Sequence, residues 1–229
     1  YTTAYESKVA NPDISWETAT SRNAGFDLRT WNSKLTLGLD VYKNSRSDIL
    51  TTPLKTLPEY SGIAAPAINI GEFENSGYEI TMGLNGANDS GFSYNLTFNF
   101  SDSNNKLVFF DEPDLADRPW QRETGGEIGR PLLYKYDGVF RSQAEIDAET
   151  LDYSGVTPLL KPGDARVQDI SGDGKIGPED KTRVGGSAFA DTQFGWNTAI
   201  NYKNLDFNMY WTGSAGGYNT YEWSFMSGT

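Results

Sequence analysis

The 229-residue sequence contains no cysteine and no histidine. The absence of cysteine excludes disulfides and thiolate metal sites, and the absence of histidine removes the usual general base and a common zinc ligand. Catalytic triads that use histidine are excluded as well. Only scattered carboxylates would support a hydrolase, so we expect a protein that is not an enzyme.

Positive charge and long apolar runs are also scarce. Lys and Arg number 19 against 31 Asp and Glu, which gives a net charge of -12. Because nucleic-acid phosphates are bound by positive surfaces, no nucleic-acid partner is expected. The sequence contains no run of about 18 apolar residues, so no membrane-spanning helix is expected. Residues 1–20 also lack the pattern of a secretion signal. The chain is therefore either soluble or crosses a membrane as strands.

Alternation of apolar and polar residues with a period of two is the main positive signal. The clearest segment is 92–101, where five aromatic or aliphatic residues alternate with Ser, Thr and Asn. Alternation of this kind predicts strands with one apolar and one polar face, and a tilted bilayer-crossing strand needs roughly 9–11 residues. Six segments follow the pattern: residues 24–29, 34–41, 78–84, 92–101, 193–202 and 205–211.

Short turns and long connections alternate between these segments. Turns are expected at Thr30–Ser33, Asn85–Gly91 and Lys203–Asn204, whereas residues 49–71 and 109–190 are long, polar connections. This asymmetry is typical of outer-membrane barrels. The sequence therefore predicts an all-β fold, an antiparallel transmembrane β-barrel segment with long extracellular loops. The alternative is a soluble β-sandwich, which shows the same alternation but rarely accommodates so long a loop.

One segment of the long connection has the spacing of a calcium loop. In residues 169–180, Asp169, Ser171 and Asp173 occupy positions 1, 3 and 5, and Gly174 occupies the sharp-turn position 6. The Lys175 carbonyl would be the ligand at position 7 and Asp180 the ligand at position 12. The segment predicts a structural Ca²⁺ site; the alternative is a Gly-rich loop held by Asx-turns without an ion.

The rest of the long connection gives weaker signals. Ser142 and Glu145 predict the start of a short helix near 143–150. An acidic cluster, Asp111, Glu112, Asp114 and Asp117, is expected to be a solvated face. Four aromatic residues could stack on sugar rings, although packing within the loop is the simpler expectation: Trp120, Tyr134, Tyr136 and Phe140.

Several ordered segments have a recognisable sequence. They are NPDISWETATSRNAGFDL at 11–28, LTLGLDVYKNSRSDILTTPL at 35–54, NIGEFENSGYEITMG at 69–83, EIGRPLLYKYDGVFRSQAEI at 127–146, GDARVQDISGDGKIGPEDKTRVGG at 163–186 and FGWNTAINYKNLDFNMYWTGSAGG at 194–217. Together these segments resemble the C-terminal barrel half of the SusC/RagA class of TonB-dependent transporters. The resemblance covers nearly the whole chain and keeps the order of the family.

The resemblance implies that residues 1–229 form about six strands of a plugged, 22-stranded barrel in the outer membrane of a Bacteroidota-type bacterium. It further implies contact with outer-membrane lipid, a SusD-like lipoprotein as partner, and import of oligosaccharides or peptides with energy from TonB. The plug and the TonB-contacting part have no counterpart here, and no final barrel strand precedes Thr229. We therefore expect a fragment. The alternative function is a soluble, calcium-stabilised β-sandwich module that binds carbohydrate.

Overall fold

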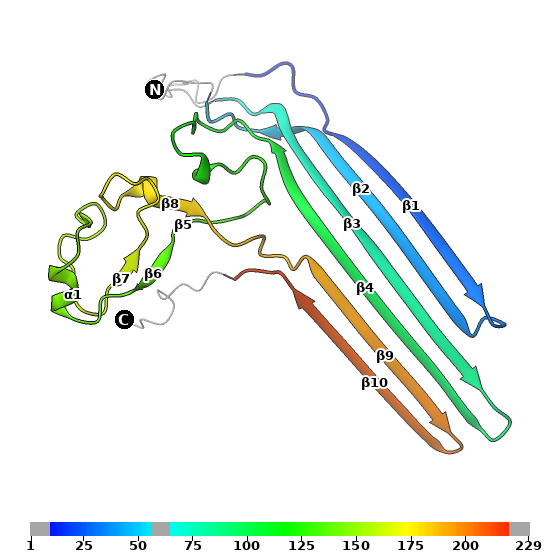
Figure 1. Cartoon of the computed structure of the whole chain (residues 1–229). Coiled ribbons are helices and arrows are strands. Elements are labelled where there is room, and N and C mark those ends of the chain that lie inside the picture. The colour runs from blue at the N-terminus through cyan, green and yellow to red at the C-terminus, as the bar shows by residue number, and fades with distance from the viewer. Residues whose placement is uncertain (1–9, 56–64, 220–229) are drawn as a thin grey trace, which may run out of the picture.

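Six long strands form one antiparallel sheet in the computed structural model, which describes residues 10–55 and 65–219. The strands lie in the order β1-β2-β3-β4-β9-β10, so neighbours in the chain are neighbours in the sheet. Figure 1 shows them running side by side, with the long connection at one end. Their bounds are β1 Thr18–Thr30, β2 Leu35–Thr51, β3 Ile68–Ala87, β4 Phe92–Phe109, β9 Thr192–Tyr202 and β10 Leu205–Ala215.

The three short turns lie together at the other end of the sheet (Figure 1). Trp31, Asn32 and Ser33 adopt positive φ between β1 and β2, and Lys203 does so between β9 and β10. In the β3–β4 turn the side chain of Asn88 accepts hydrogen bonds from the backbone N–H groups of Ser90 and Phe92. Turn residues that tolerate positive φ or bond to their own backbone therefore set the register of each hairpin.

The strands are longer than the alternation predicts. All six predicted strands are present, but β2 continues to Thr51 and β3 begins at Ile68, so the predicted connection 49–71 is too long. The predicted turn Asn85–Gly91 is likewise too long, since β3 continues to Ala87. At about 3.3 Å per residue, a strand as long as β3 extends roughly 30 Å beyond a bilayer-crossing segment.

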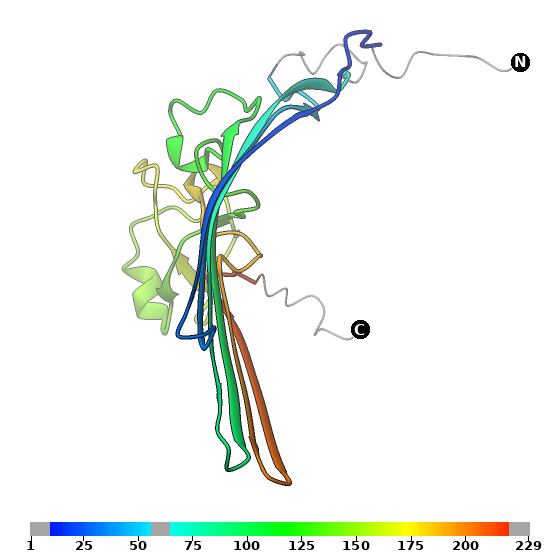
Figure 2. The ribbon, with the colours of Figure 1, turned by 90° about the vertical axis from the view of Figure 1, so that its right-hand side faces the viewer.

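Strand β2 is bent near its end by an irregular register. Asp48 has φ of 57°, and the pairing with β3 shifts between Arg46 and Ile49 and again before Leu50. An extra residue in one strand bends it and increases the local twist. Figure 2 shows the sheet curving strongly at this end.

The long connection between β4 and β9 folds into a small unit of its own. It contains two short antiparallel pairs, β5 with β8 and β6 with β7. Its elements are the 3-10 helix η2 Pro119–Gln121, β5 Leu132–Tyr134, β6 Tyr136–Val139, α1 Gln143–Asp147, β7 Ala165–Val167, the 3-10 helix η3 Pro178–Asp180 and β8 Lys181–Arg183. The predicted helix is present as α1, where Ser142 caps the Glu145 N–H and Glu145 accepts from the Arg141 N–H.

This loop unit has a small core. Phe140 is 1% exposed, Ile176 is fully buried, and the rings of Phe140 and Tyr153 meet edge to face at 5.6 Å. Tyr134 packs against the same core, and the indole N–H of Trp120 donates to the Glu179 carbonyl. The aromatic residues of the loop therefore serve mainly its own packing. Tyr136 differs, because 63% of its surface is exposed.

The sheet does not have the arrangement of a β-sandwich. Within residues 10–55 and 65–219, the six long strands form a single sheet, and the other two sheets have two short strands each. A sandwich needs a second sheet packed over the apolar face of the first. The stretch that leads to Thr229, where a final barrel strand was expected to be missing, lies outside the described residues.

Candidate functional site

One face of the six-stranded sheet is a continuous apolar surface. The pairing places Leu28, Leu37, Met82, Phe98, Trp196 and Trp211 in one row across all six strands. Side chains on this face are not covered even on the interior strands β2 and β3. Leu39 is 40% exposed and Met82 is 44% exposed. An apolar surface of this extent marks a contact with lipid or protein.

Aromatic residues lie near both ends of this apolar face. Tyr78 and Phe100 stack at 5.9 Å toward the loop end, and Phe92 and Tyr94 contact each other at 6.0 Å next to the turns. Aromatic girdles at two levels are typical of strands that cross a bilayer, because these rings favour the interface with water.

The opposite face carries short polar side chains. A row that begins at Ser21 continues with Asn44, Asn75 and Asn105 on β2, β3 and β4, each directly paired with the next. We call Asn44, Asn75 and Asn105 the amide row. Tyr42 lies beside this row and covers Gly77, where a Cβ atom would collide with the Tyr42 ring. Glycine is therefore required for the ring to lie flat.

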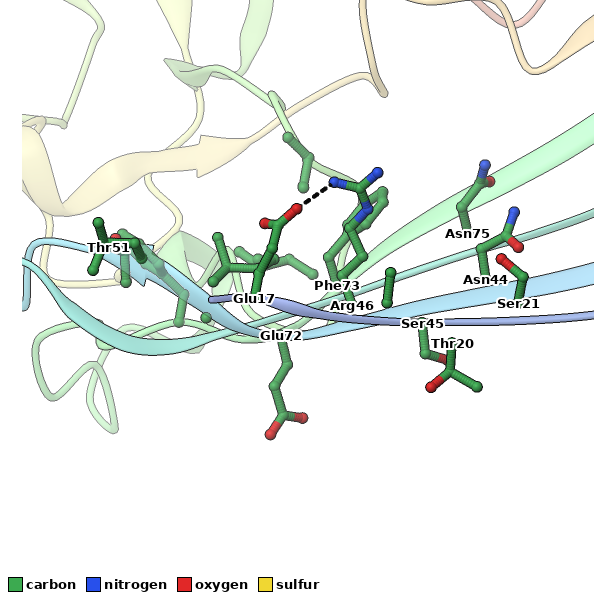
Figure 3. A pocket seen from close by; sticks show the side chains of 17 residues that line it. Glu17, Thr20, Ser21, Asn44, Ser45, Arg46, Thr51, Glu72, Phe73 and Asn75 are labelled. Carbon is green, nitrogen blue, oxygen red and sulfur yellow. Dashed lines mark hydrogen bonds and ion pairs between the residues drawn. The ribbon is translucent and has the colours of Figure 1, made fainter. Parts of the chain in front are cut away.

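A cavity of about 650 Å³ opens on this polar face at the bent end of the sheet. Figure 3 shows the side chains of Ser21, Asn44, Asn75 and Arg46 on one side of the strands, whereas Glu72 points to the other. Arg46 forms an ion pair with Glu17 at 2.8 Å at one end of the cavity. Its further lining includes Phe73, Leu107, Phe110 and Ile128.

The loop unit is attached on the polar face and closes one side of the cavity. The Ile128 N–H donates to the Asn105 side chain at 2.8 Å. The backbone of Leu107 donates to the Gly126 carbonyl and accepts from the Gly125 N–H. These bonds fold the chain after β4 back onto its own strand, so that Phe110 and Ile128 reach the cavity.

The acidic cluster at the start of the loop unit is only partly a solvated face. Glu112 accepts hydrogen bonds from the backbone N–H groups of Glu123 and Thr124 at 2.7 and 2.6 Å. Desolvation opposes ionisation of Glu112, but these bonds hold its pKa below the usual value. Asp111 accepts from the Lys55 N–H and joins the loop unit to the residues that follow β2, whereas Asp114 and Asp117 are exposed.

The residues predicted to bind calcium lie in one loop, held by hydrogen bonds to the backbone. Asp169 accepts from the N–H groups of Gly172 and Gly174, and Asp173 accepts from the Lys175 N–H. Asp180 is fully buried and accepts from the N–H groups of Ile170, Ser171 and Gly177. Among the described residues, no group of three or more acidic side chains gathers as metal ligands would. The loop order is thus explained without an ion, and calcium stays a prediction.

The Asp169 carboxylate is stabilised in its charged form. The hydrogen bond from the Gly174 N–H is the main cause, and it lowers the pKa of Asp169 together with the bond from Gly172. Ser171 adds a hydroxyl donor at 3.2 Å. Asp169 therefore organises the turn that the glycines make.

The cavity was not predicted from the sequence. Asn44, Asn75 and Asn105 are about 30 residues apart, and nothing local indicates that they share a row. The usable signal is the alternation itself, which could be continued past Val41 and Tyr78 to assign Asn44 and Asn75 to the polar face. Their register still requires the pairing of the strands.

No helix in the described part of the chain is long and apolar enough to span a membrane.

Three features together define the class of protein. They are an apolar face flanked by aromatic residues, a polar face opposite it, and short turns confined to one end of the sheet. The described strands form part of the wall of an antiparallel transmembrane β-barrel. Solved structures of the RagAB peptide importer share this fold: in its open-open state the TM-score is 0.65 at 18% identity, with 92% of this chain and 22% of that chain covered. The six-stranded sheet formed by the described residues is not closed.

Sequence comparison narrows the class to a family. No protein-family model matches. TonB-dependent receptor P3 of Formosa agariphila is 32% identical over 219 residues, which cover 91% of this chain and 21% of the receptor. TonB-dependent receptor SusC of Bacteroides thetaiotaomicron is 26% identical over 219 residues, which cover 94% of this chain and 21% of SusC. The chain belongs to the SusC/RagA type of TonB-dependent transporters and spans about a fifth of the length of these relatives. The relatives are named as receptors, not as enzymes.

Proposed function

We propose that the protein to which these residues belong imports large nutrients across the outer membrane with energy from TonB. The observation that carries the proposal is the two-faced sheet, whose apolar side suits lipid and whose polar side suits an aqueous lumen. The relatives support it, since they are named TonB-dependent receptors. The proposed function is transport, in which no covalent bond of the nutrient is made or broken.

The orientation of the wall follows from the same proposal. The turns after β1, β3 and β9 face the periplasm, and the loop unit, within residues 109–190, faces outside. Residues 1–229 then belong to the C-terminal half of the barrel. The outer membrane is that of a Bacteroidota-type bacterium, as for the relatives from Formosa and Bacteroides.

Two protein partners and two substrate classes complete the proposal. A SusD-like lipoprotein would cover the loop side, in line with the likeness to SusC and RagAB. TonB would act through an N-terminal part that lies outside this chain. The substrate is an oligosaccharide or a peptide, the latter being what the RagAB structures are named for.

The test is uptake by the full-length transporter in a Bacteroidota host that lacks its own copy. Cells are supplied with labelled neutral oligosaccharides or with a labelled peptide mixture. We expect uptake of one of the two, and we expect that it disappears when the TonB-contacting segment is deleted. Equal uptake by cells without the transporter would contradict the proposal.

A further inference from the structure

The short helix η2 is bonded to η3 and β8, which lie far from it in the sequence. Gln121 is 7% exposed, and its side-chain amide donates to the carbonyls of Pro178 at 2.8 Å and Glu179 at 3.0 Å. The indole N–H of Trp120 donates to the same Glu179 carbonyl at 2.8 Å. The Thr182 hydroxyl donates to the Trp120 carbonyl at 3.2 Å. We call the contact of Trp120 and Gln121 with Pro178 and Glu179 the latch.

Arg183, at the end of β8, braces the latch from the same side. Its guanidinium donates to the carbonyls of Gln121 at 3.2 Å and Arg130 at 2.8 Å. It also forms an ion pair with Glu123 at 3.2 Å, and both side chains of this pair are mostly buried. A planar guanidinium donates several hydrogen bonds in a fixed geometry. The η3 helix and β8 therefore hold residues 121–130 in place together.

The latch is continuous with the loop 169–180. Asp180 is the last residue of η3 and is fully buried. Its carboxylate accepts from the N–H groups of Ile170 and Gly177, among others. One turn of helix thus closes the loop with its last side chain and binds Gln121 with the carbonyls of its first two residues. An opening of the loop that releases Asp180 displaces these two carbonyls.

At its other end, the latched segment reaches the wall of the barrel. The Gly125 N–H donates to the Leu107 carbonyl at 2.7 Å, and the Ile128 N–H donates to the Asn105 side chain at 2.8 Å. Leu107 and Ile128 line the cavity on the polar face. Between the latch and the wall, Glu112 accepts from two backbone N–H groups of the segment and keeps it ordered. The whole path is formed by contacts within residues 105–183.

We propose that the latch couples the loop 169–180 to the barrel wall at Asn105, so that opening of this loop loosens the wall of the cavity. Coupling between distant sites is carried by contiguous packed and hydrogen-bonded groups, and Gln121 stands where the two halves of this path meet. Gln121 is thus a positioning residue, which acts on the cavity through residues 121–128. The inference rests on the proposed function and deepens it, because it places a control of the lumen in a loop that faces outside.

The experiment is a double-mutant cycle, read by hydrogen exchange on the purified full-length transporter in detergent. Asp180→Ala opens the loop, and Gln121→Leu removes the latch amide while keeping the side-chain size. Mass spectrometry follows peptides that cover residues 169–177 in the loop, 125–130 at the wall and 138–141, which include the buried Phe140. The control is Gln143→Leu, the same change at an exposed position of α1 whose amide donates to Asp147.

We expect Asp180→Ala and Gln121→Leu each to accelerate exchange at residues 125–130 about tenfold, because two hydrogen bonds of one amide are lost in either variant. The double variant should exchange at the rate of Gln121→Leu alone, since the loop acts on the wall through the latch. Gln143→Leu should stay within about twofold of the unmodified protein, because it leaves the latch intact.

The coupling would be overturned if residues 125–130 exchange normally while Asp180→Ala opens residues 169–177. It would also be overturned if the effects of the two variants multiply, since they would then act independently. Equal acceleration at 138–141 would show a general loosening of the loop unit and would overturn it as well. If Asp180→Ala does not fold, Asp180→Asn keeps one oxygen and provides the milder opening for the same cycle.

Uptake separates this inference from the proposed function, because hydrogen exchange requires no transport. If TonB-dependent uptake occurs but the effects of the two variants multiply, only the coupling fails. If the cycle shows coupling but no TonB-dependent uptake of either substrate class is seen, the proposed function fails and the latch remains. Correct folding of each variant is checked by its heat-modifiable mobility on gels, which reports the intact barrel.

Discussion

Single carboxylates determine the local order of the loop unit. Asp180 is buried and accepts hydrogen bonds from the backbone N–H groups of Ile170, Ser171 and Gly177. It therefore connects the two ends of this loop. Hydrogen bonds to a charged group each contribute about 1.5–3 kcal/mol, and an amide left unbonded in a buried site costs a similar amount. The loop from Ile170 to Gly177 thus depends strongly on one side chain.

Replacing Asp180 with Ala should therefore release this loop. We expect local destabilisation of at least about 3 kcal/mol, since three bonds to a buried carboxylate are lost. Limited proteolysis of the full-length transporter should detect it as faster cleavage within 169–180. Asp173→Ala is the matched control, because Asp173 is exposed and accepts one bond, from Lys175. Equal cleavage rates for the two variants would show that Asp180 has no special role.

The order of the same loop should depend on pH through Asp169. The pKa of Asp169 is lowered by the N–H bonds from Gly174 and Gly172. Its stabilising effect is therefore fully present above the unfolded value of about 3.9 and is lost as pH falls below it toward the folded pKa. Hydrogen exchange of the Gly174 amide should accelerate relative to neighbouring loops in this acidic range. In Asp169→Asn this additional acceleration should be absent.

Calcium provides a separate test at the residue scale. The spacing of Asp169, Asp173 and Asp180 predicts that calcium binds the loop and orders it. Titrating calcium into the chelator-treated, detergent-solubilised transporter should then protect residues 169–180 from protease. Magnesium serves as the control ion, since it demands a tighter octahedral geometry. Unchanged protection across the titration would mean that the loop is an ion-free set of Asx-turns.

At the scale of the element, each strand combines a membrane segment with an extension beyond it. The alternation in 78–84 and 92–101 predicted β3 and β4 because one face must be apolar where lipid surrounds it. Beyond Tyr78 the outward residues become Ser76 and Glu74, so both faces are polar and the pattern disappears. The strand continues nevertheless, because its ladder of hydrogen bonds to β2 and β4 continues.

A charged residue should be tolerated on only one face of β3. Ile80 is paired with Leu39 and Phe100 on the apolar face, and its neighbour Thr81 is paired with Gly38 and Asn99 on the polar face. An Arg on the lipid side of a barrel costs about 2–4 kcal/mol near the bilayer centre. Ile80→Arg should lower the free energy of unfolding in lipid by about this amount, whereas Thr81→Arg should change it by less than about 1 kcal/mol. Urea titration of the full-length transporter in lipid vesicles measures both, and equal costs would contradict the assignment of the faces.

At the scale of the whole molecule, the sequence predicted the wall and its asymmetry but not the cavity. The wall depends on local alternation, which six separate segments display, and the turns depend on local residues such as Asn88. The cavity depends on three non-local facts: the register that aligns Asn44 with Asn75, the bulge at Asp48, and the return of Ile128 onto Asn105. None of these can be read from a single segment.

The central claim is that alternate residues of these strands face lipid and water. These 229 residues contain no cysteine. Once cysteines elsewhere in the full-length transporter have been replaced, single cysteines introduced at positions 76–84 of this chain can be spin-labelled one at a time. We predict that labels at even positions such as Ile80 and Met82 are accessible to dissolved oxygen in the bilayer. Labels at odd positions such as Glu79 and Thr81 should be accessible to a water-soluble nickel reagent instead. Accessibility without a period of two, or with the two faces reversed, would contradict the account.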